Sequence, residues 1–203
     1  VSGTSVKGFF LLNEGNMGSN KATLDYFDYE TGIYHKNIYA ERNPGVVQEL
    51  GDVGNDIQIY GNKLYAIINC SHFVEVMNVE TAKHITQISI PNCRYIVFKD
   101  KYAYVSSYAG PVKIDPNARL GYVARVDTTT LTVKDTCVVG YQPEEMVIVG
   151  NKLYVANSGG YRVPNYDRTV SVIDLNTFKV IKTIDVGINL HRMVLDQYGN
   201  IYV

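Results

Sequence analysis

Four polar residues could form a chemical centre in this chain: Asn55, Arg94, Glu144 and His191. The chain repeats, and aligning its repeats places these residues at equivalent positions, just before one strand of each unit. Glu and Asn oxygens could help to hold a divalent cation, which needs several oxygen ligands at about 2.0–2.6 Å. Arg94 and His191 would instead repel a cation. This mixed ring therefore favours ligand binding over metal chemistry.

Further polar and aromatic side chains fall on the same predicted face, at strand ends and in the longer loops. Amide, guanidinium and phenol groups together supply adaptable hydrogen bonds and flat apolar surface, a mixture that suits ligand capture. The alternative is that the polar groups are simply solvated and that each loop Tyr packs on its own repeat. The predicted ligand-binding set comprises Asn13, Asn55, Asp56, Asn69, Arg94, Tyr95, Tyr108, Glu144, Glu145, Asn157, Tyr161, His191 and Arg192.

A recurring turn motif, Asp-x-x-Thr or Asn-x-x-Thr, predicts the strands that must position these residues. It begins at Asp28, Asn78, Asp127 and Asp174, at steps of 50, 49 and 47 residues. Each copy lies between two alternating runs rich in Val, Ile and Tyr, which predicts a strand, a tight turn and a strand. The Asp or Asn side chain can accept hydrogen bonds from the turn amides. A repeat near 48 residues made only of strands predicts propeller blades.

We therefore predict an all-β fold, a β-propeller of four-stranded blades, as a single domain over 1–203 that contains about four and a half blades. Predicted blade boundaries are about 8–50, 51–92, 93–141, 142–188 and 189–203. Strands are expected near 8–13, 22–29, 57–60, 63–69, 95–99, 102–107, 121–127, 146–149, 152–157 and 169–175, with helix almost absent. Because the sequence ends on the second strand of a blade, we expect it to be a truncated portion of a larger ring.

Composition narrows the possible partners. The chain has 203 residues, 46% of them hydrophobic, and a net charge of -1, which argues against nucleic acid or a membrane surface as the main partner. No stretch approaches the roughly 18 apolar residues of a membrane span, and no signal peptide opens the sequence, so we expect any signal or anchor to have been removed. Cys70 and Cys93 fall on neighbouring loops, where a disulfide and two free thiols are both possible.

The motifs resemble a known family. KLYVANS at 152–158, the Asp-x-x-Thr turns and Pro143 before the next strand look like the YVTN/YncE-type seven-bladed β-propellers. The opening GFFLLNEGNMGSNKATLDYFD at 8–28 is similar to the YncE-like surface-layer lipoproteins of Bacteroides. This resemblance implies a lipid-anchored protein at the cell surface or outer membrane. In the BtuG-type subgroup it implies cobalamin capture for a TonB-dependent outer-membrane transporter.

Other functions remain open at this point. Propeller lactonases and related hydrolases hold a central cation with residues such as Glu144, Asn55 and Asp56, which makes a metal-dependent hydrolase the main rival. Ser71-His72 could support nucleophilic catalysis, but no orienting acid is identifiable. A glycan would suit the same loop face as a corrinoid, and so would a protein partner. We expect no catalytic residue, no metal and no cofactor.

Overall fold

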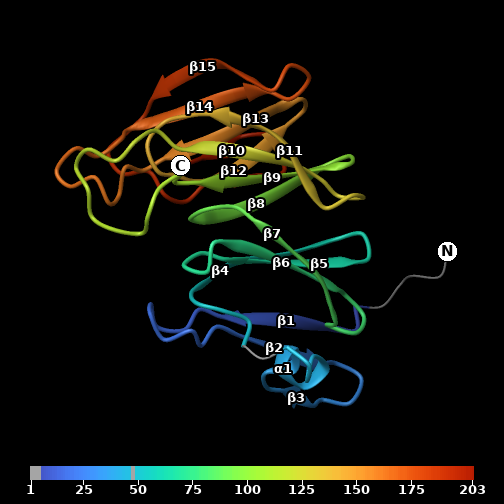
Figure 1. Cartoon of the computed structure of the whole chain (residues 1–203). Coiled ribbons are helices and arrows are strands. Elements are labelled where there is room, and N and C mark those ends of the chain that lie inside the picture. Colours follow the sequence, from blue (N-terminus) through green and yellow to red (C-terminus); the bar gives the residue numbers. More distant parts are fainter. Residues whose placement is uncertain (1–5, 47–48) are drawn as a thin grey trace. The chain divides into compact units, whose positions relative to one another are not determined.

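The computed structural model describes residues 6–46 and 49–203 and is built almost entirely from antiparallel strands (Figure 1). The chain forms two compact units. The first comprises the described residues up to Ser71 together with Glu75–Gln87, and the second comprises His72–Val74 and Ile88–Val203. Among the described residues, no helix is long and apolar enough to cross a membrane.

Three sheets are four-stranded meanders, each with its strands paired in chain order. One sheet contains β4 (Gly54–Tyr60), β5 (Lys63–Ile68), β6 (Phe73–Asn78) and β7 (His84–Ser89). The next contains β8 (Cys93–Lys99), β9 (Tyr102–Ser107), β10 (Tyr122–Asp127) and β11 (Thr132–Val138). The third contains β12 (Pro143–Val149), β13 (Lys152–Asn157), β14 (Thr169–Asp174) and β15 (Lys179–Asp185). These meanders confirm the predicted propeller fold.

Burial explains the order of strands within each meander. The second strands β5, β9 and β13 are almost wholly buried, whereas the last strands β11 and β15 are almost wholly exposed. Sheets packed face to face bury both faces of their middle strands and leave an edge strand in solvent. In the second unit the core lies between the sheets β8–β11 and β12–β15, where Tyr104, Met146 and Phe178 belong to one buried cluster.

The recurring turns close as the sequence predicts. In all four, the Asp or Asn Oδ1 accepts the N–H groups two and three residues further on, at 2.7–3.3 Å. The residue after the Thr is left-handed in every copy, with φ of 69° at Gly32, 54° at Ala82, 57° at Leu131 and 51° at Phe178. Its N–H donates to the carbonyl of the Asp or Asn at 2.8–2.9 Å. The turn geometry is therefore a property of the repeat.

The first sheet departs from the predicted hairpin. It contains β1 (Gly8–Asn13), β2 (Thr23–Asp28) and only a two-residue β3 (Tyr34–His35), after which α1 spans Ile38–Arg42. The strand predicted to follow the turn at Asp28 is therefore only two residues long. Asn37 takes a left-handed conformation that ends the extended chain, and the short helix buries Ile38 and Tyr39. A five-residue helix is less than two turns, so helix remains scarce as predicted.

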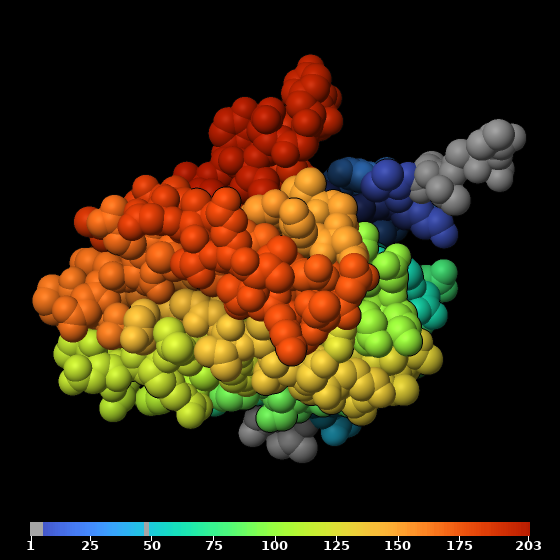
Figure 2. All heavy atoms as spheres, turned by 90° about the horizontal axis from the view of Figure 1, so that it is seen from above, coloured from blue at the N-terminus to red at the C-terminus, as the bar shows by residue number. Residues whose placement is uncertain are grey.

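Strand boundaries otherwise agree closely with prediction, with two exceptions. The first strands of the meanders begin earlier than expected, at Gly54, Cys93 and Pro143. The last pair, β16 (Val194–Leu195) and β17 (Ile201–Tyr202), is only two residues long in each strand and stands out from the second unit (Figure 2). Of the three cysteines, Cys93 and Cys137 are buried and Cys70 is partly exposed. The predicted blade boundaries and the single domain stay predictions.

Candidate functional site

Three of the four residues predicted to form the ring lie at a β-bulge that recurs at the start of each meander: Asn55, Arg94 and Glu144. Pairing shifts between Cys93 and Ile96 in β8 and between Pro143 and Met146 in β12. The prediction that Arg94 and Glu144 precede their strands is thus wrong by a small margin, because each is the second residue of its strand. A bulge sets two residues against one and redirects their side chains. That local distortion directs Arg94 and Glu144 into the same space.

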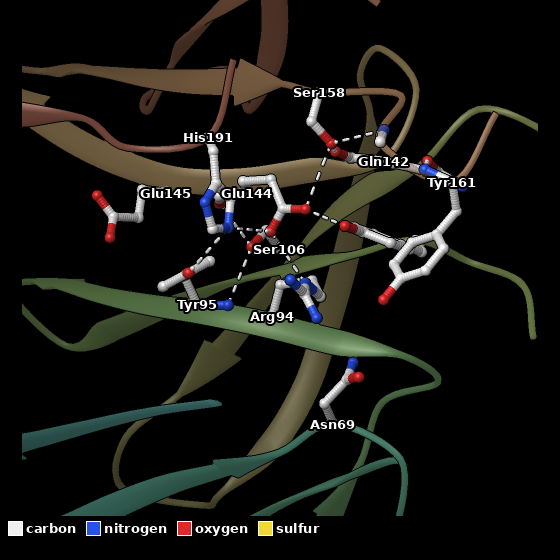
Figure 3. A network of polar contacts seen from close by, with 12 residues as sticks. Asn69, Arg94, Tyr95, Ser106, Gln142, Glu144, Glu145, Ser158, Tyr161 and His191 are labelled. Carbon is white, nitrogen blue, oxygen red and sulfur yellow. Dashed lines mark hydrogen bonds and ion pairs between the residues drawn. The ribbon is translucent and has the colours of Figure 1, made fainter. Parts of the chain in front are cut away.

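Glu144 is the centre of the resulting cluster, and its carboxylate is almost completely buried, at 2% exposed (Figure 3). Arg94 Nε donates to Glu144 Oε2 at 2.9 Å, and His191 Nε2 lies 3.5 Å from the same oxygen. The Tyr108 hydroxyl donates to Oε1, and Ser158 Oγ donates to Oε1 at 3.3 Å. Glu144 therefore joins β8, β12, the two loops that follow β9 and β13, and the segment before β16.

A second layer of contacts holds Tyr95 and His191 beside this carboxylate. Tyr95 Oη and His191 Nε2 lie 3.2 Å apart, with their rings edge to face. Ser106 Oγ accepts the Tyr95 N–H at 3.1 Å and donates to the Glu144 carbonyl at 2.9 Å. Burial raises the pKa of Tyr95, and the nearby Glu144 charge adds to that rise. Tyr95 is thus a neutral hydroxyl at physiological pH.

Glu145 points away from Glu144 into a separate pair (Figure 3). Arg192 Nη1 donates to Glu145 Oε1 at 2.6 Å, and the Met193 N–H donates to Oε2 at 2.8 Å. The Arg192 side chain is largely in solvent. This pair ties β12 to the segment before β16 and positions His191 from the other side.

Two long loops of the second unit brace one another beside the cluster: 108–121, which follows β9, and 158–168, which follows β13 (Figure 1). The Asp115 N–H donates to the Tyr161 carbonyl at 2.8 Å, and Arg162 Nε donates to the Ala118 carbonyl at 3.2 Å. The Tyr108 and Tyr161 rings meet edge to face at 6.1 Å. The loops therefore form one connected wall.

The first of these loops encloses a cavity of about 410 Å³ next to the Glu144 cluster. Its floor includes the buried residues Tyr108 and Gln142, and Lys113 and Arg119 are exposed residues of its lining. Ligand cavities commonly measure about 300–1,000 Å³. This one is large enough for a small ligand or for one edge of a larger one.

The predicted set thus divides into two groups. The second unit brings together Arg94, Tyr95, Tyr108, Glu144, Tyr161 and His191, with Glu145 and Arg192 alongside. Asn157 instead donates to Thr169 Oγ1 at 3.1 Å and to Ser171 Oγ at 2.9 Å within its own sheet. In the first unit Asn13 does the same, donating to Thr23 Oγ1 at 2.9 Å and to Asp25 Oδ2 at 2.8 Å. Asn13 thus fastens β1 to β2, and Asn157 fastens β13 to β14.

The remaining predicted residues belong to the first unit. Asn55 and Asp56 lie at the bulge of β4, where pairing shifts between Gly54 and Asp56. Asp56 Oδ1 accepts the Ile57 N–H at 2.8 Å, and the Asn69 side chain is buried directly after β5. Asn55 and Asp56 follow the first residue of β4 as Arg94 and Tyr95 follow that of β8, and Asn69 directly follows β5 as Tyr108 follows β9.

Sequence reasoning missed Ser106, Ser158 and Gln142. The position of Gln142 in the repeat is a signal that could have found it, because Val53, Asn92 and Gln142 each directly precede the first strand of a meander. In the structure all three residues have a left-handed backbone, with φ of 61°, 45° and 51°. Their carbonyls accept the N–H of the residue after the second strand at 2.8–3.1 Å.

Among the residues that the structure describes, no group of three or more His, Cys, Asp and Glu side chains could hold a metal ion.

Comparison with known proteins supports the fold. A family model described as "Domain of unknown function (DUF5074)" matches residues 7–203. Hydrazine synthase of Kuenenia stuttgartiensis is 17% identical, with a TM-score of 0.72 over 95% of this chain and 50% of that chain. The WD40 β-propeller domain of Doa1 is 13% identical, with a TM-score of 0.62 over 88% of this chain and 53% of that chain.

A third similar structure is apo AztD from Citrobacter koseri, 16% identical, with a TM-score of 0.57 over 91% of this chain and 46% of that chain. No curated protein matches the chain. The chain spans about half the length of these solved structures. At such identities the likeness shows the fold alone, a partial β-propeller.

Proposed function

We propose that this chain, which belongs to the DUF5074 family of domains of unknown function, captures a small-molecule ligand on its loop face without chemistry. The observation that carries the proposal is the state of Glu144. This is the carboxylate that a hydrolytic or metal-dependent mechanism would need, yet it is buried and occupied by Arg94, Tyr108, Ser158 and His191. Its contacts make it a brace for the loop face.

A catalytic cation at Glu144 is opposed by electrostatics. The Arg94 guanidinium already bonds one carboxylate oxygen and lies over the Tyr108 ring at 4.9 Å. A dication there would have to displace this cation or approach it closely in a site of low dielectric constant, where like charges repel strongly. The Tyr108 hydroxyl and Ser158 occupy the other oxygen. These contacts support ligand capture over a metal-dependent hydrolase.

Preorganised loops favour binding. A ligand that orders flexible loops loses affinity to their conformational entropy, whereas a prebraced wall avoids that cost. Loops 108–121 and 158–168 are joined by backbone and side-chain hydrogen bonds within the chain itself. The Arg162 guanidinium also lies 3.5 Å from the centroid of the Tyr141 ring. These contacts support a preformed site.

The resemblance of residues 8–28 to surface-layer lipoproteins extends the proposal to a corrinoid ligand, a lipid-anchored location at the outer membrane and a TonB-dependent transporter as partner. A corrinoid is broad and fringed with amides, so the cavity of about 410 Å³ would take one edge of it while Tyr161 and its neighbours cover another. A glycan edge has similar dimensions and similar hydrogen-bonding groups.

The test is retention of cyanocobalamin by the full-length protein on desalting, with and without EDTA. We expect pink protein in both cases, because capture requires no cation. Tyr161→Ala should weaken binding about tenfold or more, since exposed aromatic anchors carry much of a binding energy. Tyr198→Ala removes a more exposed ring from the turn between β16 and β17 and is the control, expected to bind normally.

Two results would count against capture. Loss of the bound corrinoid on chelation would show that a cation is required. EDTA-sensitive turnover of a lactone or ester, abolished by Glu144→Gln, would establish the hydrolase instead. Colourless protein would remove the corrinoid as the ligand.

A further inference from the structure

The cavity enclosed by loop 108–121 presents an unusual combination of donors. Gln142, on its floor, is only 3% exposed. Its Oε1 accepts the Tyr161 N–H at 2.6 Å, which fixes the orientation of the amide. Within residues 6–46 and 49–203, Gln142 Nε2 donates to no protein acceptor. The Nε2 atom is not fully enclosed by protein, so a ligand acceptor in the cavity can take its hydrogen bond in place of water.

Two cationic side chains, Arg119 and Lys113, lie in the exposed part of the cavity lining. Arg119 Nε donates to the Ala109 carbonyl at 2.7 Å, and its Nη2 donates to the same oxygen, so the guanidinium is held in place. Its Nη1 donates to no described residue. The Lys113 ammonium lies 3.9 Å from Asp115 in a loose, solvent-exposed pair. The lining therefore carries two positive charges and one negative charge.

We infer that this cavity binds the carboxylate end of an acidic sugar. Gln142 Nε2, Arg119 Nη1 and Lys113 Nζ supply donors for a carboxylate, and hydrogen bonds to ionised acceptors are the stronger kind. Asn117 and Asp115, also in the lining, offer partners for neighbouring hydroxyl groups. The volume of about 410 Å³ suits one hexuronate unit. This inference rests on the proposed ligand capture and names the ligand class of one part of that face.

The test uses D-glucuronate and D-glucose, two probes that share a ring and differ in the acidic group, titrated into the full-length protein by calorimetry or NMR. We expect glucuronate to bind about tenfold more tightly than glucose, as for a charge-assisted hydrogen bond. Equal affinity for the two sugars, or no binding of glucuronate, would overturn the inference.

Gln142→Glu tests the floor. The new side chain can still accept the Tyr161 N–H, but it replaces the Nε2 donor by an oxygen that repels a carboxylate. Glucuronate affinity should fall about tenfold or more. Because this variant places an acid in a buried position, Lys113→Gln provides a second test at an exposed residue. It should weaken glucuronate binding about two- to fivefold and leave glucose unchanged.

Lys101→Gln is the matched control, since Lys101 lies over the Tyr102 ring and lines a different hollow. It should bind glucuronate normally, and weakening equal to that of Lys113→Gln would refute a local effect. Cyanocobalamin separates the two proposals. A protein that retains the corrinoid but ignores glucuronate defeats the acidic-sugar inference and leaves capture standing, whereas a protein that binds neither probe defeats both.

Discussion

Four side chains contact the Glu144 carboxylate, and they differ in the charge and the kind of donor that they supply. Arg94 supplies the only guanidinium in this set, whereas Tyr108 and Ser158 supply neutral donors. A buried carboxylate is costly unless it is paired and hydrogen-bonded. The cluster satisfies both conditions, so its residues stabilise the loop face before any ligand arrives.

Replacing one member of the buried pair should therefore cost more than replacing both. Glu144→Gln leaves Arg94 without its carboxylate and should lower the free energy of unfolding by about 3 kcal/mol. Arg94→Met combined with Glu144→Gln removes both charges and should recover much of that loss. Denaturant unfolding of the wild type, both single variants and the double variant measures the coupling. Additive losses would show that the two residues stabilise the fold independently.

Glu75 is a second buried acid, in the first unit. Its Oε1 lies 2.5 Å from His84 Nδ1 and accepts the Tyr39 hydroxyl at 3.3 Å. Burial raises the pKa of Glu75 above 4.5, and hydrogen bonds from His84, Gln87 and Tyr39 offset only part of that rise. Folding therefore favours the protonated form of Glu75 relative to the unfolded chain.

The stabilisation that Glu75 provides should be complete below pH 4.5 and lost as pH rises through the folded pKa, since the unfolded chain ionises first. Glu75→Gln should flatten this decline in denaturant unfolding measured from pH 4 to pH 8. Asp25 is the opposite control. Burial would raise its pKa, but hydrogen bonds from Asn37, Tyr34 and Asn13 lower it overall. The stability that Asp25 contributes is therefore lost as pH falls below 3.8, and Asp25→Asn should flatten that decline when the measurement is extended to pH 2. An unchanged pH profile for Glu75→Gln would contradict this account.

At the scale of the element, the repeated turn sets the geometry of each outer hairpin. The residue after the Thr must be left-handed, a conformation that costs a residue with a side chain roughly 1–2 kcal/mol and costs Gly almost nothing. Ala82, Leu131 and Phe178 nevertheless occupy it. The hydrogen bonds of the turn are therefore strong enough to impose the conformation.

Gly32 offers a clean measure of that cost. A Cβ built there would meet nothing within 4 Å, and φ is +69°, so Gly32→Ala tests the backbone alone. We expect the free energy of unfolding to fall by about 1 kcal/mol. Gly45 is an equally open site without positive φ, so Gly45→Ala should be neutral or slightly stabilising. Equal effects in calorimetric or denaturant unfolding would remove the backbone explanation.

At the scale of the molecule, packing between the elements of the second unit brings residues together that are far apart in the sequence. Arg94 and Glu144 are 50 positions apart, and Tyr95 and His191 are 96 apart. Arg94 and Glu144 meet because a bulge recurs at the same position in two successive meanders of the second unit. His191 reaches Tyr95 from the segment that precedes β16. Because the bulge is repeated in neighbouring sheets, the side chains at its two copies converge.

The sequence alone determined the strands, the turns and the blade-like repeat. Each follows from short-range physics: alternation of apolar residues, a side chain that accepts nearby amides, and a fixed interval. It also placed Arg94 and Glu144 at equivalent positions. It did not predict that they would neutralise one another, nor that Gln142 and loop 108–121 would line a cavity. The last strand of the first sheet was also mispredicted, because α1 forms where Ile38 and Tyr39 find burial.

Those features depended on the tertiary structure for a common reason. The bulges that redirect Arg94 and Glu144 come from pairing between strands. The cavity is lined by loop 108–121, which has no regular structure, and by Gln142, which precedes the first strand of the next sheet. The backbone hydrogen bond between Asp115 in this loop and Tyr161 in loop 158–168 leaves no trace in side-chain identity. The repeat could therefore be predicted from the sequence, whereas the contents of its loop face were decided by packing.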